Sequence, residues 1–314
     1  MYLKRGAYTT FFLLFMLLLG SASLAQRRGP SEVQIRTEAV AGRVSVLFGQ
    51  GGNIAVFAGE NNTLIVDDQF APLTDKIVAA ISKISIHPVR FVVNTHWHAD
   101  HTGGNENFGK AGAVIVAHDQ VHTRLSRDQF VSFFKKTVKA SAPEALPVVT
   151  FEDSLSFRFG KEKIRVQFVG PAHTDTDAIV FFEQSNVIHT GDTYFSLRYP
   201  FLDVSTGGSI PGLIGALDRI LELADAKTRI IPGHGPLSNS AELRKTRNMI
   251  DTMRKRIDRA IANGKSDAEI IASKPTADFD SVFGGGFITG DKFVQLICDS
   301  QRKILRANAG RPDS

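Results

Sequence analysis

Short apolar runs separated by polar, glycine-containing turns extend through most of the chain. In the first half they predict strands at 43–48, 53–58, 63–67, 89–93 and 113–117. In the second half they predict strands at 154–159, 163–169, 178–183, 187–190 and 228–231. Several of these runs are apolar at nearly every position, which is typical of strands that are buried on both faces. With helices between them, the strands indicate an α/β protein.

Apolar positions at helical spacing predict the helices. The predicted helices cover 74–84, 102–108, a segment that opens at 118, 211–224, 239–262, 266–271 and 291–305. The helix at 239–262 carries many basic side chains, which we expect to form a solvated face; an anion-binding surface is the alternative. The last two helices would belong to a C-terminal extension that packs on the core or forms a dimer surface.

The first 25 residues have the features of a secretory signal peptide. Lys4 and Arg5 precede an apolar core at 11–19, and a small-x-small sequence ends at Ala25. We predict cleavage between Ala25 and Gln26, because the apolar run is too short to span a membrane well. The mature protein would then be exported without a stable membrane anchor, to the periplasm of a Gram-negative source. Its polar start would form a flexible arm.

Composition narrows the classes of partner. The formal net charge is +5, and Lys4 and Arg5 of the predicted signal peptide supply part of it, so the mature chain is only mildly basic. This charge gives little support for nucleic-acid binding, and a small-molecule substrate is the expected partner. The one cysteine, Cys298, cannot form an internal disulfide and is predicted to be a buried thiol. The sequence does not set the oligomeric state.

The densest chemistry of the chain follows the apolar run at 89–93. His96, His98, Asp100 and His101 fall within six residues. Side chains alternate along extended chain, so the first three would project to one side, while the fourth would lie where the backbone turns into the next helix. Imidazole nitrogens and carboxylate oxygens bind zinc at about 2.0–2.2 Å. Four ligands this close do not fit one tetrahedron, so the spacing suggests two adjacent metal ions.

This sequence, His-Trp-His-Ala-Asp-His, resembles the His-x-His-x-Asp-His signature of the metallo-β-lactamase superfamily. The family's later ligands have matches in order at His173, Asp192 and His234, each in a glycine-containing loop after an apolar strand. Asp67, at the end of the strand 63–67, matches an early aspartate of the family. The resemblance spans about residues 43–240.

The resemblance implies both a fold and a set of metal ligands. One zinc would be bound by His96, His98 and His173, and a second by Asp100, His101 and His234. Asp192 would bridge the two ions, and Asp67 would brace the ligand loop without binding metal. The implied fold is a four-layer αβ/βα sandwich at 40–263, preceded by the arm at 26–39 and followed by a helical extension at 264–314.

The resemblance also implies a hydrolase with two Zn²⁺ ions per chain. Zinc-bound hydroxide would attack a carbonyl carbon, and Asp100 would serve as the catalytic residue that both binds metal and orients the hydroxide. Tyr194, two residues after Asp192, would bind substrate by donating a hydrogen bond to the developing oxyanion. Packing of this tyrosine in a loop wall is the alternative.

Departures from the family pattern bear on the substrate. One β-lactamase subclass has Cys at the position of Asp192, followed by a Lys that binds the drug carboxylate, and another lacks an acidic residue there. The sequence TGDTYF instead resembles hydroxyacylglutathione hydrolases (glyoxalase II) and lactonases, while the export signal and the turn at 49–53 resemble exported β-lactamase-like members. We therefore expect cleavage of a carboxylic amide or ester, foremost a β-lactam or lactone ring.

Other classes remain as alternatives. The same ligand set serves thioester hydrolases of the glyoxalase II type and phosphodiesterases or nucleases. An iron-containing oxidoreductase is disfavoured, because His98 stands where diiron members have Glu. A non-catalytic zinc-binding protein is disfavoured because all seven ligands are present.

Several conspicuous residues are given structural roles. His118 and His122 are spaced like a zinc-binding pair on a helix, but no third ligand accompanies them, so a role at the helix start is preferred. Trp97 is predicted to pack away from the ligands, and Asn53 to line the rim of the site. The connector at 128–147, with its phenylalanines, would either overhang the site or pack as a core patch.

Overall fold

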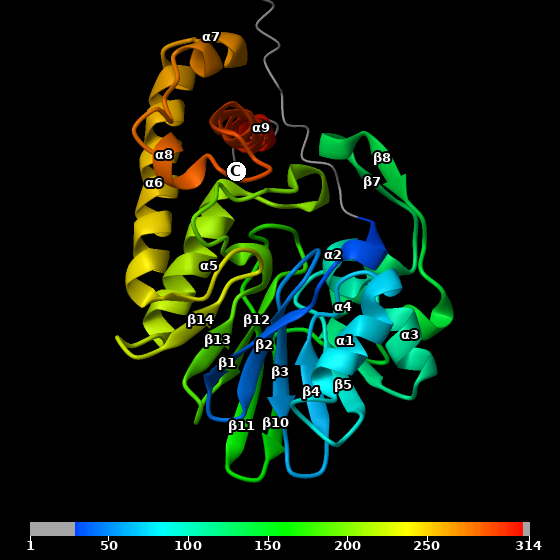
Figure 1. The fold of residues 1–314 in the computed structure, drawn as a ribbon. Helices are drawn as coiled ribbons and strands as arrows, with labels where there is room; N and C mark the ends of the chain where they lie inside the picture. Colours follow the sequence, from blue (N-terminus) through cyan, green and yellow to red (C-terminus); the bar gives the residue numbers. More distant parts are fainter. Residues whose placement is uncertain (1–28, 310–314) are drawn as a thin grey trace, which may run out of the picture.

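Two β-sheets packed face to face form the centre of the molecule, and helices cover both outer faces (Figure 1). The computed structural model describes residues 29–309, so the predicted signal peptide lies outside the described residues. Helices α1 to α4 flank the first sheet, and α5 and α6 flank the second. The predicted four-layer α/β sandwich is confirmed.

The first sheet contains seven strands in the order β1-β2-β3-β4-β5-β6-β9. Its strands are β1 (Arg36–Ala41), β2 (Val44–Phe48), β3 (Ile54–Ala58), β4 (Thr63–Val66), β5 (Val89–Val93), β6 (Val114–His118) and β9 (Val149–Phe151). Neighbours from β1 to β4 run antiparallel, and those from β4 to β9 run parallel. The carboxyl ends of β4, β5 and β6 therefore meet at one edge, from which the ligand loops emerge.

The second sheet contains six strands in the order β10 to β15. Its strands are β10 (Ser154–Phe159), β11 (Glu162–Phe168), β12 (Ala178–Phe182), β13 (Val187–His189), β14 (Arg229–Ile231) and β15 (Ser238–Asn239). A separate hairpin of β7 (Gln129–Val131) and β8 (Lys136–Val138) projects beside the helical end of the molecule (Figure 1).

Helices of very different length surround the sheets. They are α1 (Thr74–Ile81), α2 (Ala99–Thr102), α3 (Asn105–Lys110), α4 (Asp119–Leu125), α5 (Ile210–Leu223), α6 (Ser240–Ala262), α7 (Asp267–Ala272), α8 (Asp280–Phe283) and α9 (Gly290–Ala309). Single 3-10 turns are η1 (Pro30–Glu32), η2 (Ala71–Leu73), η3 (Ser132–Phe134), η4 (Pro143–Ala145), η5 (Gly191–Thr193) and η6 (Val204–Thr206). Within residues 29–309, no helix combines the length and apolarity needed to cross a membrane.

Alternation along each strand explains the continuous apolar runs. In β4, Leu64 and Val66 face the second sheet, whereas Ile65 faces the layer that contains α1. In β12, Val180 faces the first sheet and Ile179 faces the layer of α5 and α6. Because both faces of each sheet are covered, both sets of alternating positions must be apolar.

The C-terminal helices share one core with the second sheet. Phe293 and Ile297 of α9 are fully buried in the same cluster as Leu217 of α5 and Met253 of α6. Cys298 is also buried there, as predicted, and burial raises the pKa of its thiol to about 12. The extension thus packs on the core.

The structure corrects three local predictions. The single helix expected at 102–108 is instead two short helices, α2 and α3, separated at Gly103 and Gly104. The segment predicted as a flexible arm includes the start of β1, which pairs with β2 at the edge of the first sheet. The connector contains the β7–β8 hairpin, and strand β9 follows it; their runs of three residues are too short for a clear periodic signal.

Candidate metal centre

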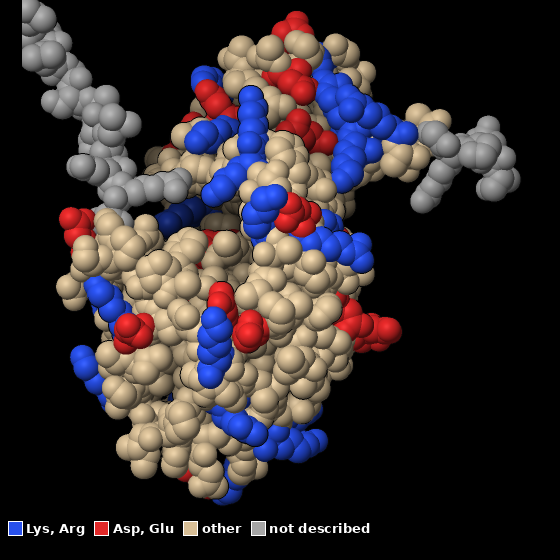
Figure 2. Space-filling view, turned by 90° about the vertical axis from the view of Figure 1, so that its right-hand side faces the viewer, with Lys and Arg blue, Asp and Glu red and all other residues tan. Residues whose placement is uncertain are grey.

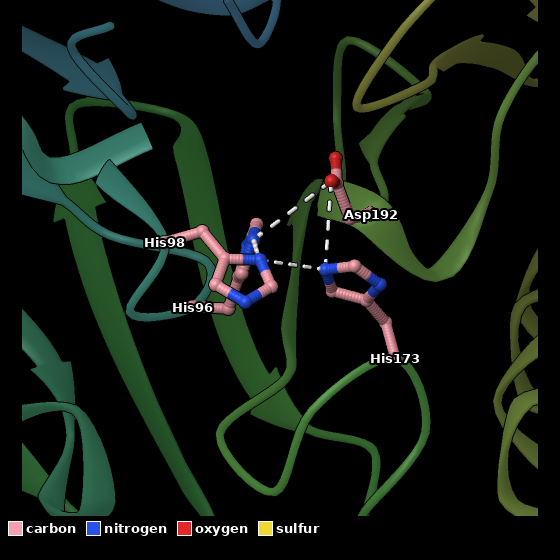
Figure 3. A group of neighbouring side chains, drawn as sticks. All are labelled: His96, His98, His173 and Asp192. Atoms are coloured by element: carbon pink, nitrogen blue, oxygen red, sulfur yellow. Dashed lines mark hydrogen bonds and ion pairs between the residues drawn. The ribbon is translucent and has the colours of Figure 1, made fainter. Parts of the chain in front are cut away.

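The seven predicted ligands converge in two adjacent clusters. His96, His98, His173 and Asp192 form the first cluster, shown in Figure 3. Asp100, His101 and His234 form the second. Within each cluster, one ligand atom from every residue lies within 4.8 Å of the others. The grouping is the one that the family resemblance implies.

The loop that carries the first four ligands is not an extended strand. Strand β5 ends at Val93, His96 and His98 lie in the following loop, and Asp100 and His101 lie in α2. The alternation argument was therefore wrong, although the side chains still converge. A tight turn of helix, rather than the pleat of a strand, turns Asp100 and His101 toward the second cluster.

Asp67 holds this loop in place from the end of β4. Its carboxylate accepts hydrogen bonds from the Thr95 amide at 2.8 Å, the Thr95 hydroxyl at 2.8 Å and Nδ1 of His101 at 2.7 Å. Asp67 is fully buried and has a positive φ of 63°, a strained conformation for a residue with a side chain. Three charge-assisted bonds offset that strain and fix the loop, as predicted for this residue.

Hydrogen bonds occupy the ring nitrogens that point away from the clusters. Nδ1 of His96 bonds to the Thr95 hydroxyl at 3.1 Å, and Nδ1 of His173 donates to the carbonyl of Phe201 at 2.9 Å. Nε2 of His98 donates to Asp203 at 3.2 Å. A partner on one ring nitrogen selects the tautomer that leaves a lone pair on the other. The lone pairs of these histidines thus face one another inside the first cluster.

The later ligands come from loops held close to the first half of the chain. Asp192 lies in η5, where Gly191 has a φ of 51° and packs against Thr95. Gly233, beside His234, leaves no room for a side chain, because a Cβ there would lie 2.0 Å from Oδ1 of Asp192. Phe195 stacks on the ring of His234 with centroids 5.1 Å apart.

Asp192 lies between the two clusters. Its Oδ2 is 3.9 Å from Nε2 of His96 and 3.6 Å from Nε2 of His173. Its Oδ1 is 3.1 Å from Nε2 of His101 and 3.4 Å from Nε2 of His234. One carboxylate oxygen therefore faces each cluster, as a bridging ligand requires.

The donor set fits divalent metal ions. In the first cluster, Nδ1 of His98 lies 3.2 Å from Nε2 of His96 and 2.9 Å from Nε2 of His173, although lone pairs facing each other repel. Ligands of a tetrahedral zinc at about 2.0–2.1 Å stand roughly 3.3 Å apart. Oδ1 of Asp192 is buried without a hydrogen-bond partner, which a metal ion would supply. Nitrogen and carboxylate ligands of this kind suit zinc.

The histidines of the two clusters differ in the direction in which their pKa values are shifted. Burial lowers the pKa of His173 to about 4 and, together with the neighbouring His101, lowers that of His96 well below its usual value. At His234, burial acts in the same direction, but Asp192 and Asp100 outweigh it and raise the pKa to about 9. His96 and His173 are thus unprotonated at neutral pH, whereas His234 and His101 must lose protons before they bind a cation.

Asp100 stays ionised in this surrounding. Burial by itself would raise the pKa of its carboxyl, but the charge of His101 and the hydrogen bond with His234 hold that pKa well below its usual range. Its Oδ2 lies 3.3 Å from Nε2 of His234. Its side chain is 29% exposed, the largest exposed fraction among the seven candidate ligands. Asp100 is therefore both negatively charged and partly accessible to solvent.

Tyr194 is the predicted site residue that the structure moves elsewhere. Its side chain is buried, and its hydroxyl hydrogen bonds to the Ser238 hydroxyl at 2.7 Å. Burial raises the pKa of this phenol. The prediction of a substrate contact is corrected to the packing alternative, because the hydroxyl already has a partner inside the protein.

Two further residues tie the site to the body of the protein. Asn53 does not line the rim but is buried, and its amide donates to the carbonyls of Pro232 and Gly235 on either side of His234. The ring of His118 accepts a hydrogen bond from the Gln120 amide at the start of α4, which confirms the predicted helix-start role. Trp97 is buried and packs as predicted, but not away from the ligands, because its ring lies 4.8 Å from that of His98, centroid to centroid.

Sequence reasoning missed Asp203. This buried carboxylate binds Nε2 of His98 and also accepts hydrogen bonds from Ser205 and Thr206 at the start of η6. The sequence Asp-x-Ser-Thr is a turn-capping pattern, so the sequence carries a signal for the turn. It carries none for the histidine, which lies 105 positions away along the chain.

Comparison with known proteins identifies the family. The family model described as "Metallo-beta-lactamase superfamily" matches residues 48–246, which are more than half of the 314-residue chain. The chain therefore belongs to the metallo-β-lactamase superfamily. At the level of the family it is a zinc-dependent hydrolase, with a metal site made of histidine and aspartate side chains.

The relatives are distant in sequence. A probable metallo-hydrolase of Methanocaldococcus jannaschii is 25% identical over 197 residues, which are 61% of this chain and 91% of that protein. A type 2 metallo-β-lactamase of Elizabethkingia meningoseptica is 27% identical over 127 residues, which are 40% of this chain and only 43% of that protein.

Solved structures share the fold. A metallo-β-lactamase from Pontibacter korlensis superposes with a TM-score of 0.57 and 19% identity, covering 69% of this chain and 99% of that one. A double mutant of a sec-alkyl sulfatase superposes with a TM-score of 0.67 and 15% identity, covering 88% of this chain and 52% of that one.

Proposed function

We propose that the protein is an exported hydrolase that holds two zinc ions and cleaves a carboxylic amide or ester. A β-lactam or lactone ring is the favoured substrate. The observation that carries the proposal is the position of Asp192, whose two carboxylate oxygens each face one cluster. A shared carboxylate lets two cations lie close together, because its negative charge offsets their repulsion.

The first cluster would bind one zinc through His96, His98 and His173, and the second would bind the other through Asp100, His101 and His234, with Asp192 between them. Zinc in such a site lowers the pKa of a bound water to about 7 and polarises a carbonyl group. The chain's own contribution is to fix the ligands. Asp67 and Asp203 orient His101 and His98 through hydrogen bonds to their outer nitrogens.

Asp100 would bind metal and orient the attacking water. Its Oδ2 is turned toward His234, which leaves Oδ1 to accept a hydrogen bond from that water. Because the carboxyl stays ionised, it keeps an oxygen lone pair available to accept that hydrogen bond and so to orient the water for attack. The same group would serve amides, esters and lactones.

The substrate assignment rests on chemistry and on limited similarity. The match to the Elizabethkingia β-lactamase covers less than half of either chain. The acidic residue at 192, in place of the cysteine of one β-lactamase subclass, favours ring esters as much as ring amides. Thioesters and phosphodiesters remain the alternatives, because the same ligand set serves them.

The test is turnover by residues 26–314 reconstituted with zinc. The panel contains a chromogenic cephalosporin, an acyl-homoserine lactone, a thioester and bis-nitrophenyl phosphate. An alkyl sulfate is added because one neighbour that shares the fold is described as a sec-alkyl sulfatase.

We expect about two zinc ions per chain and turnover of an amide or ester. Asp100→Ala should lower kcat at least 100-fold, whereas the control Asp119→Ala, outside both clusters, should not. Turnover confined to the phosphodiester or the sulfate, or protein that takes up iron instead of zinc, would contradict the proposal.

A further inference from the structure

Four phenylalanine rings from distant parts of the chain form a continuous patch. Phe133 and Phe134 come from η3 in the hairpin, Phe201 from the loop after η5, and Phe287 from the loop between α8 and α9. Phe133 and Phe134 lie 5.0 and 5.5 Å from Phe201, centroid to centroid. Both also lie 5.9 Å from Phe287. We call these four residues the phenylalanine patch.

The phenylalanine patch touches the first metal cluster. The ring of Phe201 lies 5.5 Å from that of His173 and 5.9 Å from that of His98. Its carbonyl accepts the hydrogen bond that orients His173. Ring contacts therefore run without a break from the exposed phenylalanines to the ligands of one metal position.

Half of the phenylalanine patch is open to solvent. Phe134 is 49% exposed and Phe287 is 54% exposed, and their rings are stacked with an interplanar angle of 23°. Single exposed apolar side chains are common, but grouped aromatic rings beside a polar site indicate a binding surface. The rings are anchored, because Phe201 beneath them is buried.

Cations border the open end of the phenylalanine patch. Nζ of Lys292 lies 4.6 Å from the centre of the Phe287 ring, and the side chain of Arg198 packs against Gly286. Figure 2 shows Lys and Arg side chains, with Asp and Glu side chains among them, along the helical end of the molecule above a hollow. The open end of the phenylalanine patch is therefore an apolar surface with cationic side chains only at its border.

We propose that the phenylalanine patch binds a hydrocarbon group on the acyl side of the scissile bond, so that the substrate is an acyl compound with an alkyl or aryl substituent. The choice of the acyl side depends on the proposed hydrolase function. The patch adjoins His98 and His173, whose zinc would hold the carbonyl oxygen, whereas the leaving group would lie toward His234 at the second cluster.

Binding of the carboxylate product tests the proposal without requiring turnover. The dissociation constants of butanoate, hexanoate and octanoate are measured calorimetrically on zinc-loaded protein containing residues 26–314. Every ligand offers the same carboxylate to the metals, so the change along the series reports the hydrocarbon chain alone. Each buried methylene should tighten Kd by about twofold to fourfold.

Single substitutions test whether the phenylalanine patch causes the dependence of Kd on chain length. Phe134→Ala and Phe287→Ala remove exposed side chains, so both proteins should fold, and each should weaken octanoate binding about fivefold to tenfold while changing butanoate binding less. The matched control is Phe130→Ala. Phe130 is 59% exposed on the same hairpin, and within the described part of the chain its ring pairs with none of the four. Phe130→Ala should leave the Kd values of all three carboxylates unchanged.

A Kd that does not depend on chain length, or an equal loss in the control variant, would overturn the proposal. The result separates the two proposals made here. A chain-length dependence without turnover of any amide or ester would support the apolar subsite and contradict the hydrolase assignment of its substrate. Turnover without a chain-length dependence would support the hydrolase assignment and contradict the apolar subsite.

Discussion

Gly233 shows how little space surrounds the bridging carboxylate. A Cβ at this position would lie 2.0 Å from Oδ1 of Asp192 and 2.6 Å from the carbonyl oxygen of Gly191. Since one neighbour is backbone, the strain cannot be relieved by rotating a side chain. We expect Gly233→Ala to displace Asp192 and to lower zinc affinity at least tenfold, measured by competition with a chromogenic chelator.

A matched glycine provides the control. Gly215 lies in α5, and a Cβ there would meet no heavy atom within 4 Å. Gly215→Ala should leave zinc affinity unchanged and stabilise the protein by about 0.5–1 kcal/mol, because alanine favours a helix. If both variants bound zinc like the unmodified protein, the close packing at Gly233 would have no part in metal binding.

Proton release should distinguish the two metal positions. In metal-free protein at pH 7, His234 with a pKa of about 9 carries a proton that zinc must displace, whereas His173 with a pKa of about 4 carries none. Since fewer protons compete as pH rises, zinc affinity of the second cluster should increase from pH 6 toward 9, and that of the first should change little.

Calorimetry in two buffers of different protonation enthalpy measures this release. The zinc ion that fills the second cluster should release more protons at pH 7 than the ion that fills the first. Equal release in both binding steps would contradict the difference in pKa between the clusters.

At the scale of single residues, the sequence predicted the ligands and the bracing role of Asp67, but not the other residues that orient the ligands. His96, His173 and Asp192 stand in recognisable strings after apolar strands, so their spacing and order carry the information. Asp203 and Thr95 act through contacts that exist only once the chain has folded. The prediction that Tyr194 contacts substrate was wrong for the same reason. Proximity to a ligand along the chain does not determine where a hydroxyl points.

At the scale of elements, periodicity worked where the elements are long. The predicted strand at 154–159 and the predicted helix at 239–262 agree with β10 and α6 to within one residue. The three-residue strands β13 and β14 were still predicted, because each contains apolar residues before a ligand loop, whereas β8 and β15 lack an apolar run and are defined only by their partners. The basic face of α6 proves largely ion-paired, for instance Arg247 with Asp218, which supports the solvated-face prediction.

The start of α6 gives a prediction at this scale. The side chain of Asn239 accepts hydrogen bonds from the amides of Ala241 and Glu242, both at 3.0 Å. Asn239→Ala leaves these amides without that partner and should lower the free energy of unfolding by about 1 kcal/mol, measured by urea denaturation. Asn239→Asp keeps an accepting oxygen and should retain most of the stability; an equal loss in both would point away from capping.

At the scale of the whole molecule, the C-terminal extension is part of the main core. Ile297 of α9 is fully buried in the cluster that also contains residues of α5 and α6. Ile297→Ala should lower the free energy of unfolding by about 2–5 kcal/mol. The control Leu305→Ala, 54% exposed on the same helix, should change it by less than about 0.5 kcal/mol.

Two probes show whether the extension unfolds with the rest. Trp97 is the single tryptophan and lies buried beside the metal ligands, so its fluorescence reports the centre of the molecule, while far-ultraviolet circular dichroism reports all helices. Coincident transitions are expected for one cooperative unit. A separate helical transition at lower urea would mean that α7 to α9 form an independent unit.

The division of the ligands between the two halves also sets an order in time. A growing chain presents His96, His98, Asp100 and His101 first, and the first cluster is completed only when Asp192 has been made. The second waits for His234. During synthesis, therefore, the motif at 96–101 offers only some of the ligands of each cluster, and a metal ion that bound at this stage would have an incomplete set of ligands. A complete set of ligands therefore exists only after both halves of the chain have been made and the two sheets have packed together.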